Sequence, residues 1–235
     1  MTDLSNNLQN LVIANHILAH EGVVDAFGHV SFRHPDNPDH YWLSCSRAPE
    51  LVVAEDLMEY TLDGEPIDQQ DRTMYAERPI HGGVYQARPD VQAVIHNHSM
   101  AVIPYGVTNT PLRPIFHLAA VIGELVPVWD IRDTFGDTNM LVTTMDQGRD
   151  LAEALADGRV ALMRGHGCLV VGSSIKTAVM ASIYLQVNAK LLSESLGMGE
   201  VTYLSPGEVE LMGQTQVRPL SGDRAWEYWA RRAGC

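Results

Sequence analysis

Two histidines that lie two residues apart are the first feature of this sequence that suggests chemistry. They are His96 and His98, at the end of the apolar run Val-Gln-Ala-Val-Ile-His-Asn-His-Ser. On a β-strand such side chains point to the same face and lie roughly 6–7 Å apart along the strand. Two imidazoles in this arrangement can bind one metal ion at about 2.0–2.1 Å each. The pattern also fits an ordinary strand that carries two histidines.

A third imidazole is available at His166, which lies between two glycines in Arg164-Gly-His-Gly167. Glycine permits close approach of the backbone and unusual φ values, so we expect a tight connection between two strands here. Three histidines that leave one coordination position open are typical of catalytic metal sites, whereas structural sites use four ligands. Imidazole and water ligands suit zinc, manganese or iron.

A carboxylate precedes these histidines in the chain. Glu77 lies two residues before Pro79, and proline is a common first residue of a helix. At the edge of such a helix a carboxylate can face a cleft, where it is a natural general acid or base beside a metal ion. The alternative is that Glu77 only caps the helix.

Composition and charge exclude several classes of function. The chain has 235 residues, 46% hydrophobic and 19% charged, with a net charge of −13. The acidic balance argues against nucleic acid and anionic membrane surfaces as partners. No apolar run approaches the ~20 residues that span a bilayer. Three scattered cysteines, and an N-terminus without a signal-peptide pattern, predict reduced thiols in a cytoplasmic protein.

The elements that must position these residues follow from hydrophobic periodicity and turn signals. We expect strands at residues 29–33, 41–44, 55–60, 91–98, 160–163 and 168–171, and helices at 4–21, 79–86, 147–155, 174–196 and in part over 208–233. No repeat or linker divides the chain, so we expect one domain over residues 1–235. Several strand pairs have short connections, which predicts an α/β fold, a three-layer α/β/α sandwich on a mixed or antiparallel central sheet.

Taken together, these motifs resemble the class II aldolase and adducin-like family. The resemblance covers roughly residues 8–200 and rests on four segments in the expected order: Gly28-His-Val-Ser-Phe-Arg33, Glu77-Arg-Pro-Ile-His81, the His-x-His segment and the Gly-His-Gly segment. It implies a homotetramer with active sites at subunit interfaces. It also implies a divalent metal on His96, His98 and His166, with Glu77 as the catalytic acid or base.

Departures from the sugar-phosphate aldolases of this family indicate a different substrate. The places where those aldolases bind phosphate hold Gly28-His29, Ser46-Arg47-Ala48-Pro49 and Tyr75-Ala76 in this chain. The asparagine and short hydroxyl donors of a phosphate nest are largely missing. Arg47 instead offers a planar fork suited to a carboxylate. His117 falls where those aldolases carry a tyrosine that reaches a neighbouring active site and donates a proton. A histidine can do a related job at neutral pH, so the resemblance implies that His117 is catalytic.

The motifs look more like the decarboxylase branch of the family. Its members act on hydroxylated aromatic or pyridine dicarboxylates such as 3-hydroxy-2-methylpyridine-4,5-dicarboxylate or 3,4-dihydroxyphthalate. The resemblance implies non-oxidative decarboxylation of a small carboxylate, with Mn²⁺ favoured and Zn²⁺ or Fe²⁺ as alternatives. The side chains expected to bind the substrate are His29, Ser46, Arg47, His81 and Arg78. Structural roles are the alternatives: a surface charge for Arg47, a polar contact for His29, an intersubunit salt bridge for Arg78, and packing for His81.

Three other functions are compatible with the motifs. A metal-dependent aldolase acting on a non-phosphorylated hydroxy acid or aldehyde would release a carbonyl fragment instead of CO2. An iron-dependent oxygenase would consume oxygen. An adducin-like binding module would perform no chemistry, and the presence of Glu77 with all three histidines argues against it. The metal content of the purified protein separates enzyme from module.

Overall fold

The fold is built on one seven-stranded sheet. A computed structural model describes residues 4–216 and 219–235. The strands are β1 (His29–Arg33), β2 (His40–Ser44), β3 (Leu57–Thr61), β4 (Ala93–Asn97), β5 (Val128–Trp129), β6 (Val160–Met163) and β7 (Gly167–Gly172). They lie in the order β3-β2-β1-β4-β7-β6-β5. All neighbouring pairs are antiparallel except β5 and β6, which are parallel, so the expected mixed sheet is confirmed.

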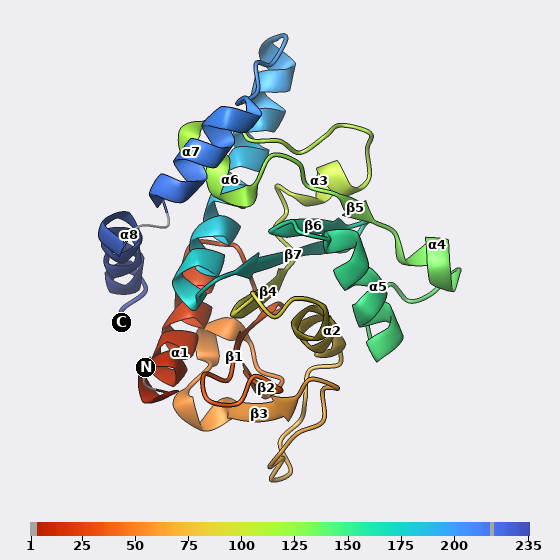
Figure 1. The fold of residues 1–235 in the computed structure, drawn as a ribbon, viewed down its shortest axis with the longest axis vertical. Coiled ribbons are helices and arrows are strands. Elements are labelled where there is room, and N and C mark those ends of the chain that lie inside the picture. Colours follow the sequence, from red (N-terminus) through yellow and green to blue (C-terminus); the bar gives the residue numbers. More distant parts are fainter. Residues whose placement is uncertain (1–3, 217–218) are drawn as a thin grey trace.

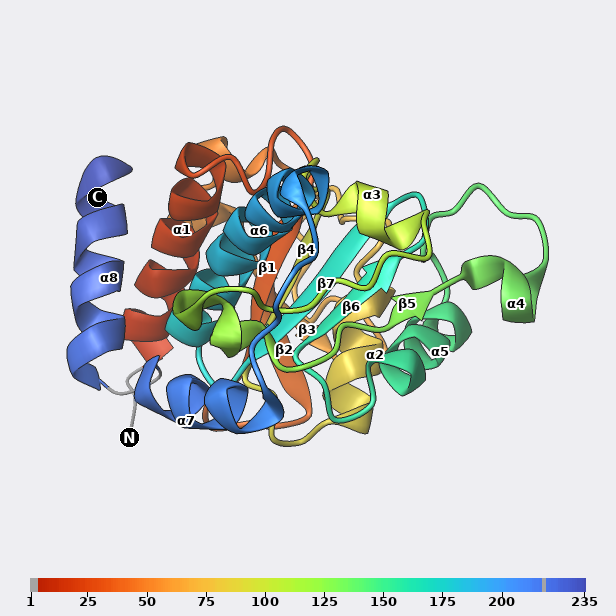
Figure 2. The same cartoon turned by 90° about the horizontal axis from the view of Figure 1, so that it is seen from above.

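Helices cover both faces of this sheet (Figures 1 and 2). One face carries α1 (Leu4–His20) and α6 (Ile175–Met198), with α8 (Pro219–Arg232) packed against them, and the other carries α2 (Pro79–Ala87) and α5 (Met145–Leu155). The connections contain α3 (Ile103–Gly106), α4 (Ile131–Phe135), α7 (Pro206–Gln216) and the 3₁₀ helices η1 (Pro49–Leu51), η2 (Ala54–Asp56) and η3 (His117–Ile122). The expected three-layer sandwich is therefore confirmed.

The strands divide their side chains between two cores because successive residues of a strand point to opposite faces. In β4, Ala93 and Ile95 join the core beneath α1 and α6, whereas Val94 joins the core beneath α2 and α5. The same alternation directs His96 to the α2 side of the sheet. In β1, Val30 also belongs to the α1 core, so its neighbours His29 and Ser31 face α2.

Most expected elements are present, with differences at their ends. The strand expected at 55–60 begins later, because residues 54–56 form a 3₁₀ turn in which the Asp56 carboxylate accepts a hydrogen bond from the Val53 amide at 2.9 Å. The tail over 208–233 contains two helices, and residues 217 and 218 of that range lie outside the described residues. The two-residue strand β5 was not expected, since so short a segment carries no periodicity.

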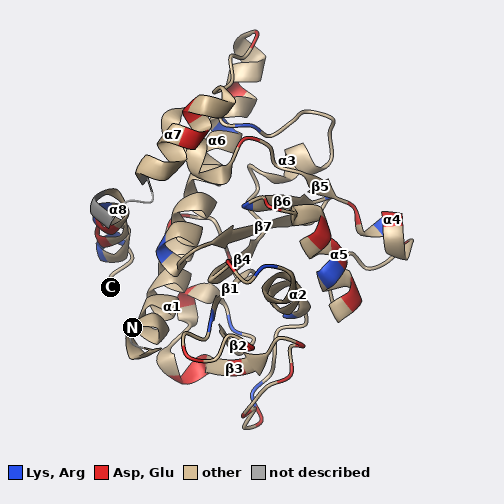
Figure 3. Cartoon of the chain, viewed as in Figure 1, with Lys and Arg blue, Asp and Glu red and all other residues tan. Residues whose placement is uncertain are grey.

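Charged side chains lie mainly on the outer helices and loops. Strands β4, β6 and β7 at the centre of the sheet contain no Asp, Glu, Lys or Arg (Figure 3). Among the described residues, no helix is both long enough and apolar enough to cross a membrane.

Helices α2 and α5 come unusually close because both carry glycine where they meet. A Cβ atom at Gly83 would lie 2.4 Å from the carbonyl carbon of Gly148, and one at Gly148 would lie 2.2 Å from the carbonyl oxygen of Pro79. Backbone atoms cannot move aside as a flexible side chain can. This contact fixes the first turn of α2, which begins at Pro79, two residues after Glu77.

We predict that Gly83→Ala lowers the free energy of unfolding by about 1–3 kcal/mol, because the added methyl group overpacks the α2–α5 contact. The matched control is Gly197→Ala in α6, where a Cβ would meet no atom within 4 Å. That change should raise the free energy of unfolding by about 0.5–1 kcal/mol, because glycine is a poor helix former. Urea denaturation measures both values. A Gly83→Ala variant as stable as the wild type would contradict the described contact.

Candidate metal centre

Three imidazoles and one carboxylate converge at the end of β4. The Nε2 atom of His98 lies 3.0 Å from Nε2 of His96 and 3.1 Å from Nε2 of His166. The Glu77 carboxylate lies 3.6 Å from the His96 nitrogen and 3.5 Å from the His166 nitrogen. Atoms held 2.0–2.1 Å from a tetrahedral centre lie about 3.3–3.4 Å from one another. The observed spacing therefore fits a single bound cation.

Hydrogen bonds behind the imidazoles fix which ring nitrogens face the centre. Nδ1 of His96 lies 3.1 Å from the carbonyl oxygen of Cys168, and Nδ1 of His166 lies 3.0 Å from that of Met140. A carbonyl can only accept, so both Nδ1 atoms carry the proton and both Nε2 atoms present lone pairs. Nε2 of His98 lies about 3 Å from both of these lone pairs, so either a proton on that nitrogen or a cation must lie between the rings. A divalent ion satisfies all of them at once.

Glycines let the backbone bring His166 to this position. Gly165 has a φ angle of +65°, which non-glycine residues rarely adopt. A Cβ at Gly167 would lie 2.2 Å from the carbonyl oxygen of Asn97 and 2.9 Å from the ring of His98. The turn between β6 and β7 thus needs the glycines on both sides of the histidine.

Glu77 contributes a carboxylate to the centre and does not cap α2. Its Oε1 atom accepts a hydrogen bond from the Val142 amide at 2.9 Å, and no side chain caps the start of the helix. Burial opposes ionisation, but the neighbouring His166 and His96 outweigh it and lower the pKa of Glu77 well below its ordinary value. Glu77 is therefore an anion at neutral pH, which suits it to balance a bound cation.

The surrounding imidazoles are neutral. Burial, reinforced by His96 and His166, lowers the pKa of His98 to about 4. Burial also lowers the pKa of His81 to about 3, and it lowers that of His29 well below the ordinary value. At neutral pH these rings carry lone pairs, which is the state that a metal ligand or a hydrogen-bond relay requires.

A cavity of about 330 Å³ opens in front of the centre. It is lined by Ala26, Phe27, Gly28, His29, Ser46, Arg47, Ala48, Tyr75, Ala76, Glu77, His98 and Leu141. Sequence reasoning identified His29, Ser46 and Arg47 here. It did not assign Phe27, Tyr75 or Leu141, although Tyr75 lies only two residues before Glu77.

The remaining residues expected at the site have varied surroundings. One guanidinium nitrogen of Arg47 lies 3.1 Å from the Asp56 carboxylate, and nearly half of the Arg47 side chain is exposed. Arg78 donates to the backbone carbonyls of Gly64 and Tyr75 and does not line the cavity. His81 is fully buried behind the cavity.

His117 lies apart from the other residues expected at the site. It is exposed and lines a different cavity of about 540 Å³, together with Tyr184 and Trp229. Within one chain it therefore takes no part in the cavity beside Glu77.

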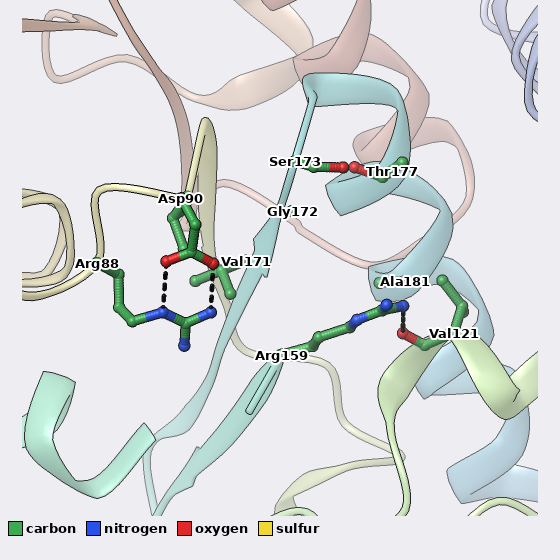
Figure 4. A pocket seen from close by; sticks show the side chains of 10 residues that line it. Arg88, Asp90, Val121, Arg159, Val171, Gly172, Ser173, Thr177 and Ala181 are labelled. Carbon is green, nitrogen blue, oxygen red and sulfur yellow. Dashed lines mark hydrogen bonds and ion pairs between the residues drawn. The ribbon is translucent and has the colours of Figure 1, made fainter. Parts of the chain in front are cut away.

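A third cavity, of about 180 Å³, lies between the start of β4 and the end of β7, away from the histidines (Figure 4). Its arginines already have partners: Arg88 forms a double hydrogen bond with Asp90, and Arg159 donates to the Val121 carbonyl at 3.0 Å. The residues that line it include no histidine. It offers no set of metal ligands.

Comparison with known proteins supports the resemblance seen in the motifs. A family model described as class II aldolase and adducin N-terminal domain matches residues 9–192. Decarboxylase tropJ of Talaromyces stipitatus is 34% identical over 92% of this chain and 90% of its own length. The 3,4-dihydroxyphthalate decarboxylase of Arthrobacter keyseri is 28% identical over 77% of this chain and 75% of its own length.

The fold has a counterpart among solved structures. The L-fuculose 1-phosphate aldolase of Glaciozyma antarctica superposes with a TM-score of 0.79, covering 99% of this chain and 92% of that one. At 22% sequence identity this likeness concerns the fold alone.

We predict that the chelator-treated protein binds one Zn²⁺ or Mn²⁺ per chain, and that His98→Ala weakens binding at least about 100-fold because a ligand is lost. The control is His40→Ala. The His40 ring lies outside the centre, with its Nδ1 atom 2.7 Å from the Glu59 carboxylate, so its loss should leave the metal affinity unchanged. Isothermal titration calorimetry measures both. Wild-type affinity in the His98→Ala variant would contradict the assignment.

Proposed function

The chain belongs to the class II aldolase and adducin family, and from this premise we propose that it is a divalent-metal-dependent decarboxylase of a hydroxylated aromatic or pyridine carboxylate. Its named relatives include decarboxylases, and solved structures of its fold include aldolases, and both activities are those of carbon–carbon lyases. The chain is thus an enzyme of the lyase class. The observation that carries the finer proposal is the cluster of three imidazoles and Glu77 beside an aromatic-walled cavity.

The lining of the cavity supports a flat carboxylate as substrate. Phe27 and Tyr75 supply aromatic surface, and Leu141 adds an aliphatic wall. Arg47 has five N–H donors, and Asp56 accepts from one of its terminal nitrogens, so others remain for a substrate carboxylate. The Tyr75 hydroxyl hydrogen-bonds to the backbone of Arg47 and thereby steadies this loop. Ser46 lies beside them as a further polar contact.

The three histidines and Glu77 are the groups that would hold the ion. Their Nε2 lone pairs and the anionic carboxylate match the donors that Mn²⁺, Zn²⁺ and Fe²⁺ accept, with Mn²⁺ favoured by the resemblance to the decarboxylase branch. When bound, the ion supplies a Lewis acid that stabilises negative charge on a substrate oxygen.

Glu77 is the group that would move the proton. As a carboxylate it accepts the proton of the hydroxyl group next to the scissile carboxylate, and it then returns that proton to the ring carbon that bears the carboxylate. The carbon–carbon bond breaks, CO2 leaves, and the bond's electron pair restores the aromatic ring. The substrate oxygen finally regains a proton from solvent, so the net reaction consumes one proton and releases one CO2.

We predict CO2 release from at least one ortho-hydroxylated aromatic or pyridine carboxylate, tested across a panel that includes 3,4-dihydroxyphthalate. Glu77→Gln should lower kcat by about 10²–10⁴-fold, because the amide cannot accept the proton. Glu59→Gln is the matched control, since Glu59 bonds to His40 outside the centre, and it should retain wild-type kcat.

Other products would contradict this proposal. Release of an aldehyde or ketone from a hydroxy acid, without CO2 from any aromatic member of the panel, would identify an aldolase. Oxygen consumption during turnover would identify an oxygenase. Full turnover in the Glu77→Gln variant would remove the assigned role of the carboxylate.

We also propose that the protein is a homotetramer with active sites at subunit interfaces. Large apolar side chains are exposed around the centre: Phe27 by 67%, Met100 by 72% and Leu141 by 38%. A second chain could cover such a surface, and homo-oligomers are usually symmetric, so one contact would recur at every site. His117, which lies outside the cavity of its own chain, would then act in the cavity of a neighbour.

We predict that Glu77→Gln and His117→Ala, each inactive alone, regain partial activity when both kinds of chain are present in the same oligomer. Glu77→Gln lacks the base, and His117→Ala lacks the group from the neighbour. Co-expression of the two variants creates some sites with both groups intact, so partial activity should return, and analytical ultracentrifugation should report four chains. Absence of recovery in a verified mixed assembly would contradict a shared site.

A further inference from the structure

A chain of hydrogen bonds runs behind the cavity, from His29 into the protein interior. Nδ1 of His29 lies 2.6 Å from Nε2 of His81, whose Nδ1 lies 2.6 Å from the hydroxyl of Ser31. That hydroxyl lies 2.8 Å from the hydroxyl of Tyr85. All four side chains are buried, with at most 3% of each residue exposed.

The arrangement follows from the periods of two elements. His29 and Ser31 lie two residues apart on β1 and share a face. His81 and Tyr85 lie four residues apart on α2 and also share a face. These faces of β1 and α2 pack against each other. Side chains from the strand and from the helix therefore alternate along the chain of hydrogen bonds. The described residues provide no hydrogen-bond partner for Nε2 of His29, and its ring lines the cavity.

The number of available protons fixes which group donates in each of these hydrogen bonds. Ser31 is the only acceptor that the described residues offer to the Tyr85 hydroxyl, so Tyr85 donates to Ser31. The Ser31 proton must then go to Nδ1 of His81. With Nδ1 accepting, a neutral His81 carries its proton on Nε2 and donates it to Nδ1 of His29. His29 in turn carries its own proton on Nε2.

The opposite direction leaves one group unpaired. If His29 donated to His81, and His81 to Ser31, then Ser31 would donate to Tyr85. The Tyr85 hydroxyl proton would have no acceptor among the described residues, inside a fully buried site. A buried donor without a partner is costly, which disfavours this direction.

We propose that Tyr85, Ser31 and His81 are positioning residues that fix His29 as the Nε2–H tautomer, so that His29 donates a hydrogen bond into the cavity. This inference rests on the proposed function in one respect: the recipient would be an anionic oxygen of the carboxylate substrate. Arg47 donates from the loop and His29 from β1. The cavity thereby selects molecules that present acceptor oxygens to both.

The direct test is a nitrogen NMR experiment on the full-length protein. A long-range ¹H–¹⁵N correlation spectrum of the zinc-loaded, ¹⁵N-histidine-labelled protein distinguishes protonated Nε2 from protonated Nδ1. Asparagine variants of His29 and of His81 assign the signals. We expect both rings to carry the proton on Nε2. A proton on Nδ1 of either ring would overturn the proposal.

Removal of one hydroxyl tests whether the buried line of groups sets this state. In Tyr85→Phe the final donor is lost, so His29 and His81 should show a mixture of tautomers. The matched control is Tyr60→Phe, since Tyr60 is fully buried in the same core and, among the described residues, its hydroxyl donates a hydrogen bond only to the sulfur of Met58. That variant should keep the wild-type tautomers. Unchanged tautomers in Tyr85→Phe would overturn the proposal.

Kinetics extend the test to substrate binding. Tyr85→Phe should raise KM about tenfold for a carboxylate substrate, with a smaller effect on kcat, because one oriented hydrogen bond is weakened. A tenfold fall in kcat with an unchanged KM would contradict a role in substrate binding. The two proposals fail separately: absence of CO2 release with Nε2–H tautomers counts against the decarboxylase, and an Nδ1–H tautomer counts against this inference.

Discussion

The convergence of three imidazole nitrogens and one carboxylate at one point is the constraint on which the active site depends. Three imidazole nitrogens face one another at about 3 Å, and backbone carbonyls hold two of the rings so that they cannot turn their protons inward. An anionic carboxylate completes the set. A divalent cation would engage all three nitrogens and balance the carboxylate at once, so we infer that the fold is organised to hold one.

Each layer of the sandwich contributes to holding these groups. The period of two on β4 directs His96 to the α2 side of the sheet, and His98 follows directly after the last residue of that strand. The glycine-flanked turn between β6 and β7 delivers the third. Glycine contacts between α2 and α5 fix the helix that follows Glu77, and the same helix carries the groups that back His29. The four candidate ligands are thus secured by backbone packing as well as by their own hydrogen bonds.

The sequence reveals the parts of this site that depend on local geometry. Strand alternation identifies His96 and His98, and flanking glycines identify His166. It does not reveal Phe27, Tyr75 or Leu141, because loops from distant parts of the chain bring them to the cavity. The two-residue β5 and the donation of Arg78 to backbone carbonyls likewise depend on tertiary contacts that leave no periodic pattern.

X-ray absorption spectroscopy of the zinc-loaded protein tests the central claim most directly, because it reports the atoms bound to the ion without requiring a substrate. We expect scattering from three imidazole rings, with nitrogen and oxygen ligands at about 2.0–2.1 Å. A shell that contains sulfur at about 2.3 Å, or one without imidazole scattering, would contradict it.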